Sequence, residues 1–136
     1  MFDLVSNNPM IQLSARGMTL AGQRMALVAS NLANIDTPGY RTKDFDFEAA
    51  FKAEMEKLDR QFRPTPGQPR EIAGPVSTPP IIHPIDIKDE RNDGNDVHLD
   101  RETAALAKTQ ATYQFASNLA QTELRLVMSA IRDAAK

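Results

Sequence analysis

Hydrophobic residues recur at helical spacing in two long stretches, one near each end of the chain. In the first stretch they lie seven residues apart, and each is followed three positions later by a small or apolar residue, which predicts a helix with a coiled-coil seam. The seam consists of Ile11, Met18, Met25 and Leu32, followed by Ser14, Ala21, Val28 and Ile35. Asn8 is a favourable N-cap and Pro9 fits the first helical position, so we expect a helix over residues 9–34.

A second apolar stripe lies on the other side of this predicted helix. It consists of Leu13, Leu20 and Leu27. At ~100° per residue these leucines lie about 160–200° around the axis from the seam. The polar arc that remains is narrow and contains Arg16. Two interior glycines, Gly17 and Gly22, each cost roughly 1 kcal/mol relative to alanine, a cost that a closely packed neighbouring backbone would explain.

The second helical stretch runs from residue 101 to residue 134. Asp100 is the expected N-cap, Glu102 favours the positive helix start, and Leu99 is placed to pack on Ala104. One stripe consists of Leu106, Tyr113, Ala120, Leu124, Val127 and Ile131. Another, on the far side, consists of Phe115, Leu119 and Leu126.

The middle of the chain is rich in proline. Seven of the nine prolines fall between Pro64 and Pro84, so no helix is expected to persist there. Short extended pieces are predicted at 71–73 and 85–88. The chain thus divides into an N-terminal helical segment with a turn and a short following segment (1–58), a connector or small β-hairpin (59–99) and a C-terminal helix (100–136). The predicted fold is all-α, an elongated hairpin of two long coiled-coil-like helices with an irregular or short β connector.

Helices that are apolar on two sides need neighbours on two sides. With two long helices, the intramolecular pair covers one stripe of each, and the other stripes are expected to meet further chains. The alternative is a single antiparallel bundle with ordinary exposed leucines. The residues expected to form assembly contacts are Leu13, Met18, Leu20, Met25, Leu27, Leu32, Phe115, Leu119 and Leu126.

Composition narrows the range of partners and chemistry. The chain of 136 residues has no cysteine and no tryptophan, and its net charge is −2. The absence of cysteine excludes disulfides, thiolate metal sites and cysteine nucleophiles. The charge balance gives no reason to expect nucleic acid as a partner. Neither a secretory signal nor a membrane-spanning run is recognisable, so we expect no direct membrane insertion and no cleaved signal peptide.

A dense polar motif follows the first helix. The residues from 30 to 41 read Ser-Asn-Leu-Ala-Asn-Ile-Asp-Thr-Pro-Gly-Tyr-Arg. Pro38 and Gly39 suit the central positions of a type II turn, in which glycine supplies the positive φ. The residues expected to set this turn are Asn31, Asn34, Thr37, Pro38, Gly39 and Tyr40. Asn31 and Asn34 are either ordinary helix-end residues or, inside an interface, residues that fix its register.

This motif resembles the signature of the flagellar basal-body rod proteins, a Ser-Asn-Leu-Ala-Asn core before Thr-Pro-Gly-Tyr and a basic residue. The residues from 93 to 102, Asp-Gly-Asn-Asp-Val-His-Leu-Asp-Arg-Glu, followed by Tyr113-Gln114, are similar to the proximal rod protein B subfamily. The C subfamily is the nearest alternative. The resemblance implies export through the flagellar type III apparatus, polymerisation into the proximal rod, and contacts with copies of itself and with other rod and export-gate proteins. It also implies that both terminal helices pack near the axis of a tube that transmits torque.

Catalytic and metal sites are not expected from the sequence. The run from 89 to 95 has a passing likeness to a calcium loop, but it places Arg91 where an oxygen ligand is required. His83 and His98 lack further ligands at metal spacing. Arg16, Arg24 and Arg41 are expected to be solvated or to form salt bridges between subunits.

We therefore expect a structural rod subunit with no catalytic residues, cofactor, metal or small-molecule substrate. Two other classes remain open. One is a helical secretion chaperone or adaptor, which would form a small closed complex with a client, whereas a rod subunit forms open heterologous assemblies. The other is an enzyme, for which no catalytic motif is present.

Overall fold

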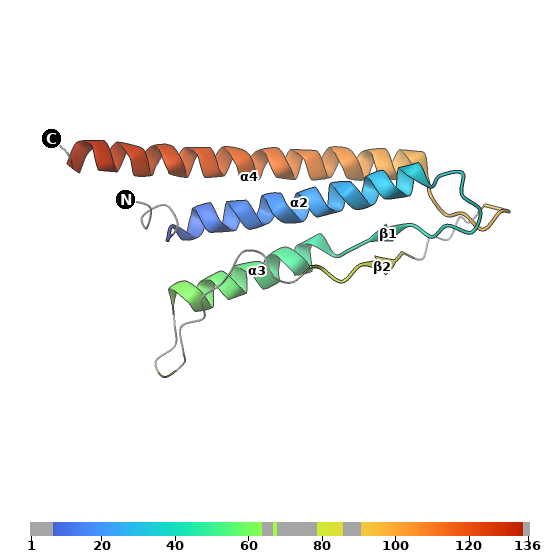
Figure 1. The fold of residues 1–136 in the computed structure, drawn as a ribbon, viewed down its shortest axis with the longest axis horizontal. Coiled ribbons are helices and arrows are strands. Elements are labelled where there is room, and N and C mark those ends of the chain that lie inside the picture. Colours follow the sequence, from blue (N-terminus) through green and yellow to red (C-terminus); the bar gives the residue numbers. More distant parts are fainter. Residues whose placement is uncertain (1–6, 64–66, 68–78, 86–90, 135–136) are drawn as a thin grey trace.

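The chain folds into an elongated arrangement of three helices that run side by side (Figure 1). The computed structural model describes residues 7–63, 67, 79–85 and 91–134. Its elements are α2 (Pro9–Ala33), β1 (Lys43–Asp44), α3 (Phe47–Phe62), β2 (His83–Pro84) and α4 (Leu99–Ala134). Helix α2 lies between α3 and α4, and both neighbours run antiparallel to it (Figure 1). The predicted all-α fold with two long helices is confirmed, and α3 adds a third layer to the hairpin.

Both ends of α2 form as their residues predict. The side chain of Asn8 accepts hydrogen bonds from the backbone N–H of Met10 (2.9 Å) and of Ile11 (3.1 Å), and Pro9 occupies the first helical position. These bonds satisfy N–H groups that have no partner inside the helix. At the other end the helix stops at Ala33, with Asn34 as its C-cap.

Helices α2 and α4 approach closely through small residues. Ser14, Gly17 and Ala21 are buried on the α4 side of α2. A Cβ placed on Gly17 would lie 3.6 Å from the Cβ of Ala116 and 3.3 Å from the ring of Phe51. The conformational cost of this glycine is therefore explained by close packing inside the chain itself. The larger seam residues Met18, Met25 and Leu32 are half-buried.

The second stripe of α2 is covered by α3, which corrects the expectation that it faces another chain. Leu20 is only 1% exposed, and Leu13 and Leu27 are half-buried. Leu58 of α3 is buried and Phe45, just before α3, is 4% exposed on the same side. With only two long helices this stripe would lack a neighbour, but α3, only 16 residues long, supplies the missing apolar layer. Leu20 is therefore a core residue of the single chain.

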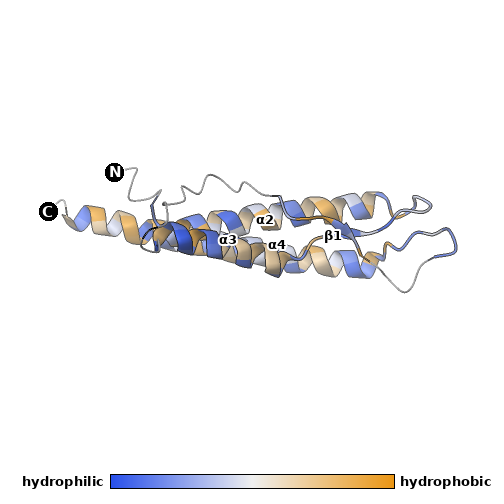
Figure 2. Cartoon of the chain, turned by 90° about the horizontal axis from the view of Figure 1, so that it is seen from below, coloured by the Kyte–Doolittle hydropathy of each residue, from blue (hydrophilic) through white to orange (hydrophobic). Residues whose placement is uncertain are grey.

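Helix α4 begins at Leu99, so Asp100 lies in its first turn and is not the N-cap. Leu99 is 51% exposed and does not pack as a staple. The inward face of α4 is polar near its start and small further on, with Glu102, Thr109 and Ala116 buried. Phe115 and Leu126 are 71% and 59% exposed, whereas Leu119 is half-buried. Apolar residues continue to the last described turns of α4, past the start of α2 (Figures 1 and 2).

The connector returns along the bundle and pairs with the segment before α3. β1 and β2 are antiparallel, with Lys43 opposite Pro84 and Asp44 opposite His83. The observed strand β2 therefore ends just before the extended piece predicted at 85–88. Its partner strand, β1, lies before α3 and not in the connector. The predicted piece at 71–73 and most of 85–88 lie outside the described residues. Helix α3 continues to Phe62, across the expected segment boundary at 58.

Replacing Leu20 by alanine tests whether α3 covers this stripe within one chain. Because the leucine is buried, we expect Leu20→Ala to lower the free energy of unfolding by about 3 kcal/mol. The exposed Leu126→Ala is the matched control and should change it by less than about 0.5 kcal/mol. Urea denaturation of the dilute chain, followed by circular dichroism, provides both values. Equal, small effects for the two variants would contradict the packing of α3 on α2.

Candidate functional site

The turn motif forms the centre of a polar network at one end of the molecule, where α2 ends and α4 begins. Its central residue is Asn31, which is 1% exposed. The Asn31 amide donates to the backbone oxygen of Lys43 (2.9 Å) and to Oε2 of Glu102 (3.0 Å). Its Oδ1 accepts from the Lys43 N–H (3.0 Å) and the Tyr40 hydroxyl (3.2 Å). One side chain thus joins α2, the returning strand and the first turn of α4.

The chain reversal after α2 has the predicted turn geometry. The Tyr40 N–H donates to the backbone oxygen of Thr37 (3.2 Å), and Gly39 has φ +70°. This is the pattern of a type II turn, with Pro38 and Gly39 at its centre. Asn34 supports it, because its amide donates to the oxygen of Ser30 and its Oδ1 accepts from the Thr37 hydroxyl (3.2 Å).

The segment that leads into α4 docks directly on this turn. Asn95 is fully buried, and its amide donates to three backbone oxygens, those of Asn34 (2.9 Å), Ile35 (3.1 Å) and Thr37 (2.8 Å). Its Oδ1 accepts from the N–H of Val97 (2.8 Å). These contacts satisfy carbonyl groups at the end of α2 that the helix leaves without partners. Residues far apart in sequence thereby close one end of the hairpin.

Asp96 adds a buried negative charge to the same end. Its Oδ1 accepts from the N–H (2.6 Å) and the hydroxyl (2.8 Å) of Thr42, and Arg41 lies 3.5 Å from its Oδ2. Burial alone would raise the pKa of Asp96, but the hydrogen bonds from Thr42 and the charge of Arg41 outweigh it, so the pKa lies below its usual value. The carboxylate is therefore held in its charged form. We name the network of Asn31, Thr42, Asn95, Asp96 and Glu102 the polar clamp.

The arginines expected at the surface or between subunits pair within the chain. Arg16 is 5% exposed and donates to Glu54 of α3, which also accepts from Lys57 (2.7 Å). Burial would raise the pKa of Glu54, yet Lys57 and Arg16 together hold it below its usual value. Arg24 forms a two-pronged pair with Asp44, with Nε 3.0 Å from Oδ1. These pairs fix α3 and β1 against α2.

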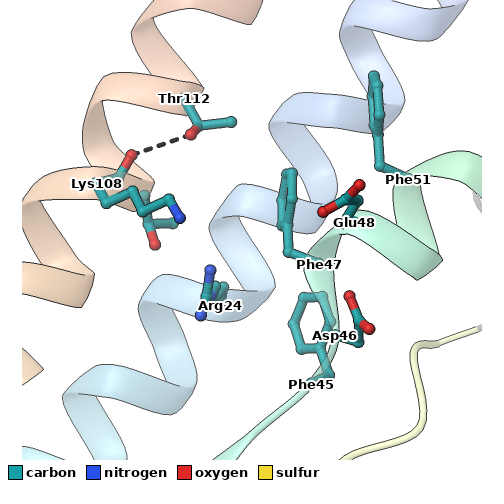
Figure 3. Close-up of a pocket in the computed structure, with 9 residues that line it drawn as sticks. Arg24, Phe45, Asp46, Phe47, Glu48, Phe51, Lys108 and Thr112 are labelled. Carbon is teal, nitrogen blue, oxygen red and sulfur yellow. Dashed lines mark hydrogen bonds between the residues drawn. The ribbon is translucent and has the colours of Figure 1, made fainter.

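A cleft opens beside these pairs, between α3 and α4 (Figure 3). Phe47 and Phe51 line it from α3, and Lys108 and Thr112 from α4, with Arg24 of α2 between them. Its volume is about 440 Å³. Within the described residues no group of three or more His, Cys, Asp or Glu side chains is arranged to hold a metal ion. The polar side chains of the cleft are two acids, a lysine, an arginine and two threonines.

The structure separates the predicted site residues into two groups. The turn residues Asn31, Asn34 and Tyr40 come together at the clamp, while Thr37, Pro38 and Gly39 form its exposed rim. The residues expected at assembly contacts are spread over several surfaces, and their role between chains remains a prediction, except that Leu20 is excluded by burial. The signal for Asn95 and Asp96 in the sequence is their place in the pattern that resembles the rod proteins. Thr42 had no signal in the sequence at all.

None of the helices in the described part of the chain combines the length and the apolarity that crossing a bilayer would require.

Comparisons with known proteins match the turn region and most of the chain. A family model described as flagella basal body rod protein matches residues 11–41, which cover α2 almost completely together with the turn. The chain is also similar to three proteins named flagellar basal body rod protein FlgB. The relative from Escherichia coli (strain K12) is 28% identical over 127 residues, 90% of this chain and 92% of its own. That from Salmonella typhimurium is 28% identical over 130 residues, with the same coverage. That from Bacillus subtilis (strain 168) is 29% identical over 104 residues, 76% of this chain and 78% of its own.

Replacing the central asparagine tests how much the clamp stabilises the fold. Asn31→Ala would remove four hydrogen bonds, one of them to the buried carboxylate of Glu102, so we expect a loss of about 3 kcal/mol in the free energy of unfolding. Asn118→Ala, at an exposed position of α4, is the control and should change little. Urea denaturation measures both variants. If Asn31→Ala were as stable as the control, the clamp would not hold the two helices together.

The clamp carboxylate predicts a specific loss of stability in acid. Because the pKa of Asp96 is depressed in the folded chain, its contribution is fully present above the usual value of 3.8 and is lost as the pH falls below it. We expect Asp96→Asn to be less stable than the parent chain at pH 7, and the difference to shrink below about pH 3.8. Asp36→Asn, at an exposed position, should follow the parent at every pH. A constant difference for Asp96→Asn between pH 7 and pH 3 would refute this linkage.

Proposed function

Since this chain belongs to the flagellar basal-body rod protein family, we propose that it is a structural subunit of the bacterial flagellar rod. The relatives over most of its length are named rod protein FlgB, which supports the B subfamily over the C subfamily. Its place is then the proximal rod, in the basal body. The subunit works by packing against its neighbours, and this role requires no catalysis.

The polar clamp is the observation that carries this proposal beyond similarity. Asn31, which is 1% exposed, joins the end of α2 to the start of α4 through a buried bond to Glu102 and to the returning strand through part-buried bonds to Lys43. The family match at residues 11–41 includes this asparagine and the turn beside it. The two terminal helices therefore form one stiff unit, and we propose that this unit is the building block of the rod. A rod that transmits torque requires subunits whose long helices do not pivot against each other.

Assembly partners follow from the same proposal. Copies of this chain and other rod and export-gate components are the expected neighbours. The exposed residues Phe115 and Leu126 remain candidates for these contacts, together with half-buried Leu119. Export through the flagellar type III apparatus without a cleaved signal is the expected route to the basal body.

Localisation in isolated basal bodies tests the function directly. An epitope-tagged chain should restore motility in a strain of the source bacterium that lacks this gene. Immunogold labels on purified basal bodies should then lie on the rod near its membrane-proximal end. A secretion chaperone would instead be recovered in the cytoplasm bound to a client, and basal bodies without label would reject the rod assignment.

A further inference from the structure

A groove opens between the start of α2 and the end of α3, at the opposite end of α2 from the polar clamp. Its apolar lining comes from Met10 and Leu13 of α2 and from Met55, Leu58 and Phe62 of α3, and its volume is about 300 Å³. Leu58 is 5% exposed, but the two methionines are 40% and 46% exposed. The start of α2 and the end of α3 lie at the same end of the bundle (Figure 1). The groove is therefore an apolar surface that the described part of the chain leaves partly open.

The ion pairs that fasten α3 and β1 to α2 lie further along the bundle. Arg24 pairs with Asp44 in β1, and Arg16 pairs with Glu54 in the middle of α3. From Arg16 back to Pro9 the start of α2 extends by about 10 Å, at 1.5 Å per residue. This part of the contact between the two helices contains the groove. An apolar segment that filled it would extend the packing of α3 on α2 to the ends of both helices.

The residues that precede α2 match the groove in composition and in position. Residues 1–6, which lie outside the described part of the chain, read Met-Phe-Asp-Leu-Val-Ser, so four of the six are apolar. Pro9, three residues further along, already lines the groove. From Pro9 back to Phe2 an extended chain reaches roughly 24 Å. The groove runs only about 11 Å along α3 from Met55 to Phe62, so the segment is long enough to cover all of it.

We propose that residues 1–6 dock in this groove of their own chain, with the side chains of Phe2 and Leu4 against Met10 and Met55. The occupant is the chain's own segment because a short tether raises its effective concentration at the groove to about millimolar, which a separate molecule does not reach. Methionine suits the contact, since its flexible side chain adapts to an irregular apolar partner. The docked segment fastens the end of α3 to the start of α2. This docking takes place in the single chain and does not depend on the proposed rod function.

The charges at the rim of the groove agree with this occupant. In an extended segment Phe2 and Leu4 point to one side and Asp3, the only charged residue among the six, points to the other. Arg63 lines the groove, and its side chain is 85% exposed in a long pair with Asp59, at 3.9 Å. Because an exposed pair of this kind contributes little, Arg63 can pair with Asp3 at little cost. The charge of the segment is then neutralised at the edge of the groove.

A tryptophan at position 2 tests the docking, because the chain has no tryptophan of its own. In the full chain, Phe2→Trp should give blue-shifted emission and weak quenching by acrylamide, since the indole is buried in the groove. Met55→Glu in this background should shift the emission to the red and restore quenching, while the circular dichroism spectrum keeps its helical form. Ala53→Glu, at an exposed position about 160° around α3 from Met55, is the matched control and should leave the emission unchanged.

Three results of this measurement would overturn the proposal. Emission typical of a solvated indole in Phe2→Trp would show that the segment does not enter the groove. A blue shift that grows with protein concentration would show that a second copy, and not the same chain, fills it. A blue shift that persists after Met55→Glu would place the segment elsewhere on the molecule.

Disulfide trapping gives an independent answer, because the chain has no cysteine. The bond requires Cα atoms within about 7 Å of each other. Leu4→Cys together with Met55→Cys should therefore form a disulfide within one chain when oxidised glutathione is added to a dilute solution. Leu4→Cys with Ala53→Cys is the control pair and should form far less. Mass spectrometry distinguishes a bond within one chain from a bond between chains. A bond mainly between chains, or equal yields for the two pairs, would reject docking within one chain.

Hydrogen exchange shows whether the docked segment fastens α3. Because burial of a phenylalanine side chain stabilises the closed state, Phe2→Asp should speed the exchange of the amides from Leu58 to Phe62 by about tenfold or more. The amides from Thr109 to Ala116 should exchange as in the parent chain, since α4 does not line the groove. Unchanged exchange at the end of α3 would show that the segment does not hold it. All of these measurements use the purified chain, so their failure would leave the rod assignment intact, and basal bodies without label would leave the groove intact.

Discussion

The fold depends on one buried amide. Asn31 has two donors and two acceptor positions, and the structure satisfies all four, from β1, from Tyr40 and from Glu102 at the start of α4. A buried amide left without these partners would cost more free energy than any one of the bonds contributes. Three segments must therefore be in place together. This requirement fixes the axial register of α4 relative to α2. Contacts between small apolar residues alone would define that register less well.

The rest of the helical packing follows from this fixed register. With Asn31 beside Glu102, Gly17 lies beside Ala116, where the absence of a side chain allows the close approach. Continued at the same register, the start of α2 lies beside the residues near 124. The last turns of α4 therefore run past α2 (Figure 1). Leu126 and Met128 lie in this overhang and are exposed, because the 36 residues of α4 exceed the 25 of α2.

Local signals in the sequence predicted local structure well. The cap at Asn8 and the type II turn at Pro38 and Gly39 are formed by residues that are close together in sequence. A short segment therefore contains enough information to predict each of them. The incorrect predictions concern pairs of interacting residues that are far apart in the sequence. Arg16 occupies a polar position that looks solvated, and only its pairing with Glu54, 38 residues away, places it in the interior. Periodicity identified the leucine stripe around Leu20 but could not show which element covers it.

The number of neighbouring helices explains why large apolar residues of α4 stay exposed in the single chain. Helix α2 has one neighbour on each apolar side, α4 on the seam and α3 on the leucines, so little of its large apolar surface remains for another chain. Helix α4 packs along its length on α2 alone, and in the described part of the chain α3 faces it only across the cleft lined by Phe47, Phe51 and Lys108. An apolar residue on its outer flanks contributes nothing to the single fold. Under the proposed rod function such residues are the candidates for contacts with neighbouring subunits, because packing inside the single chain does not use them.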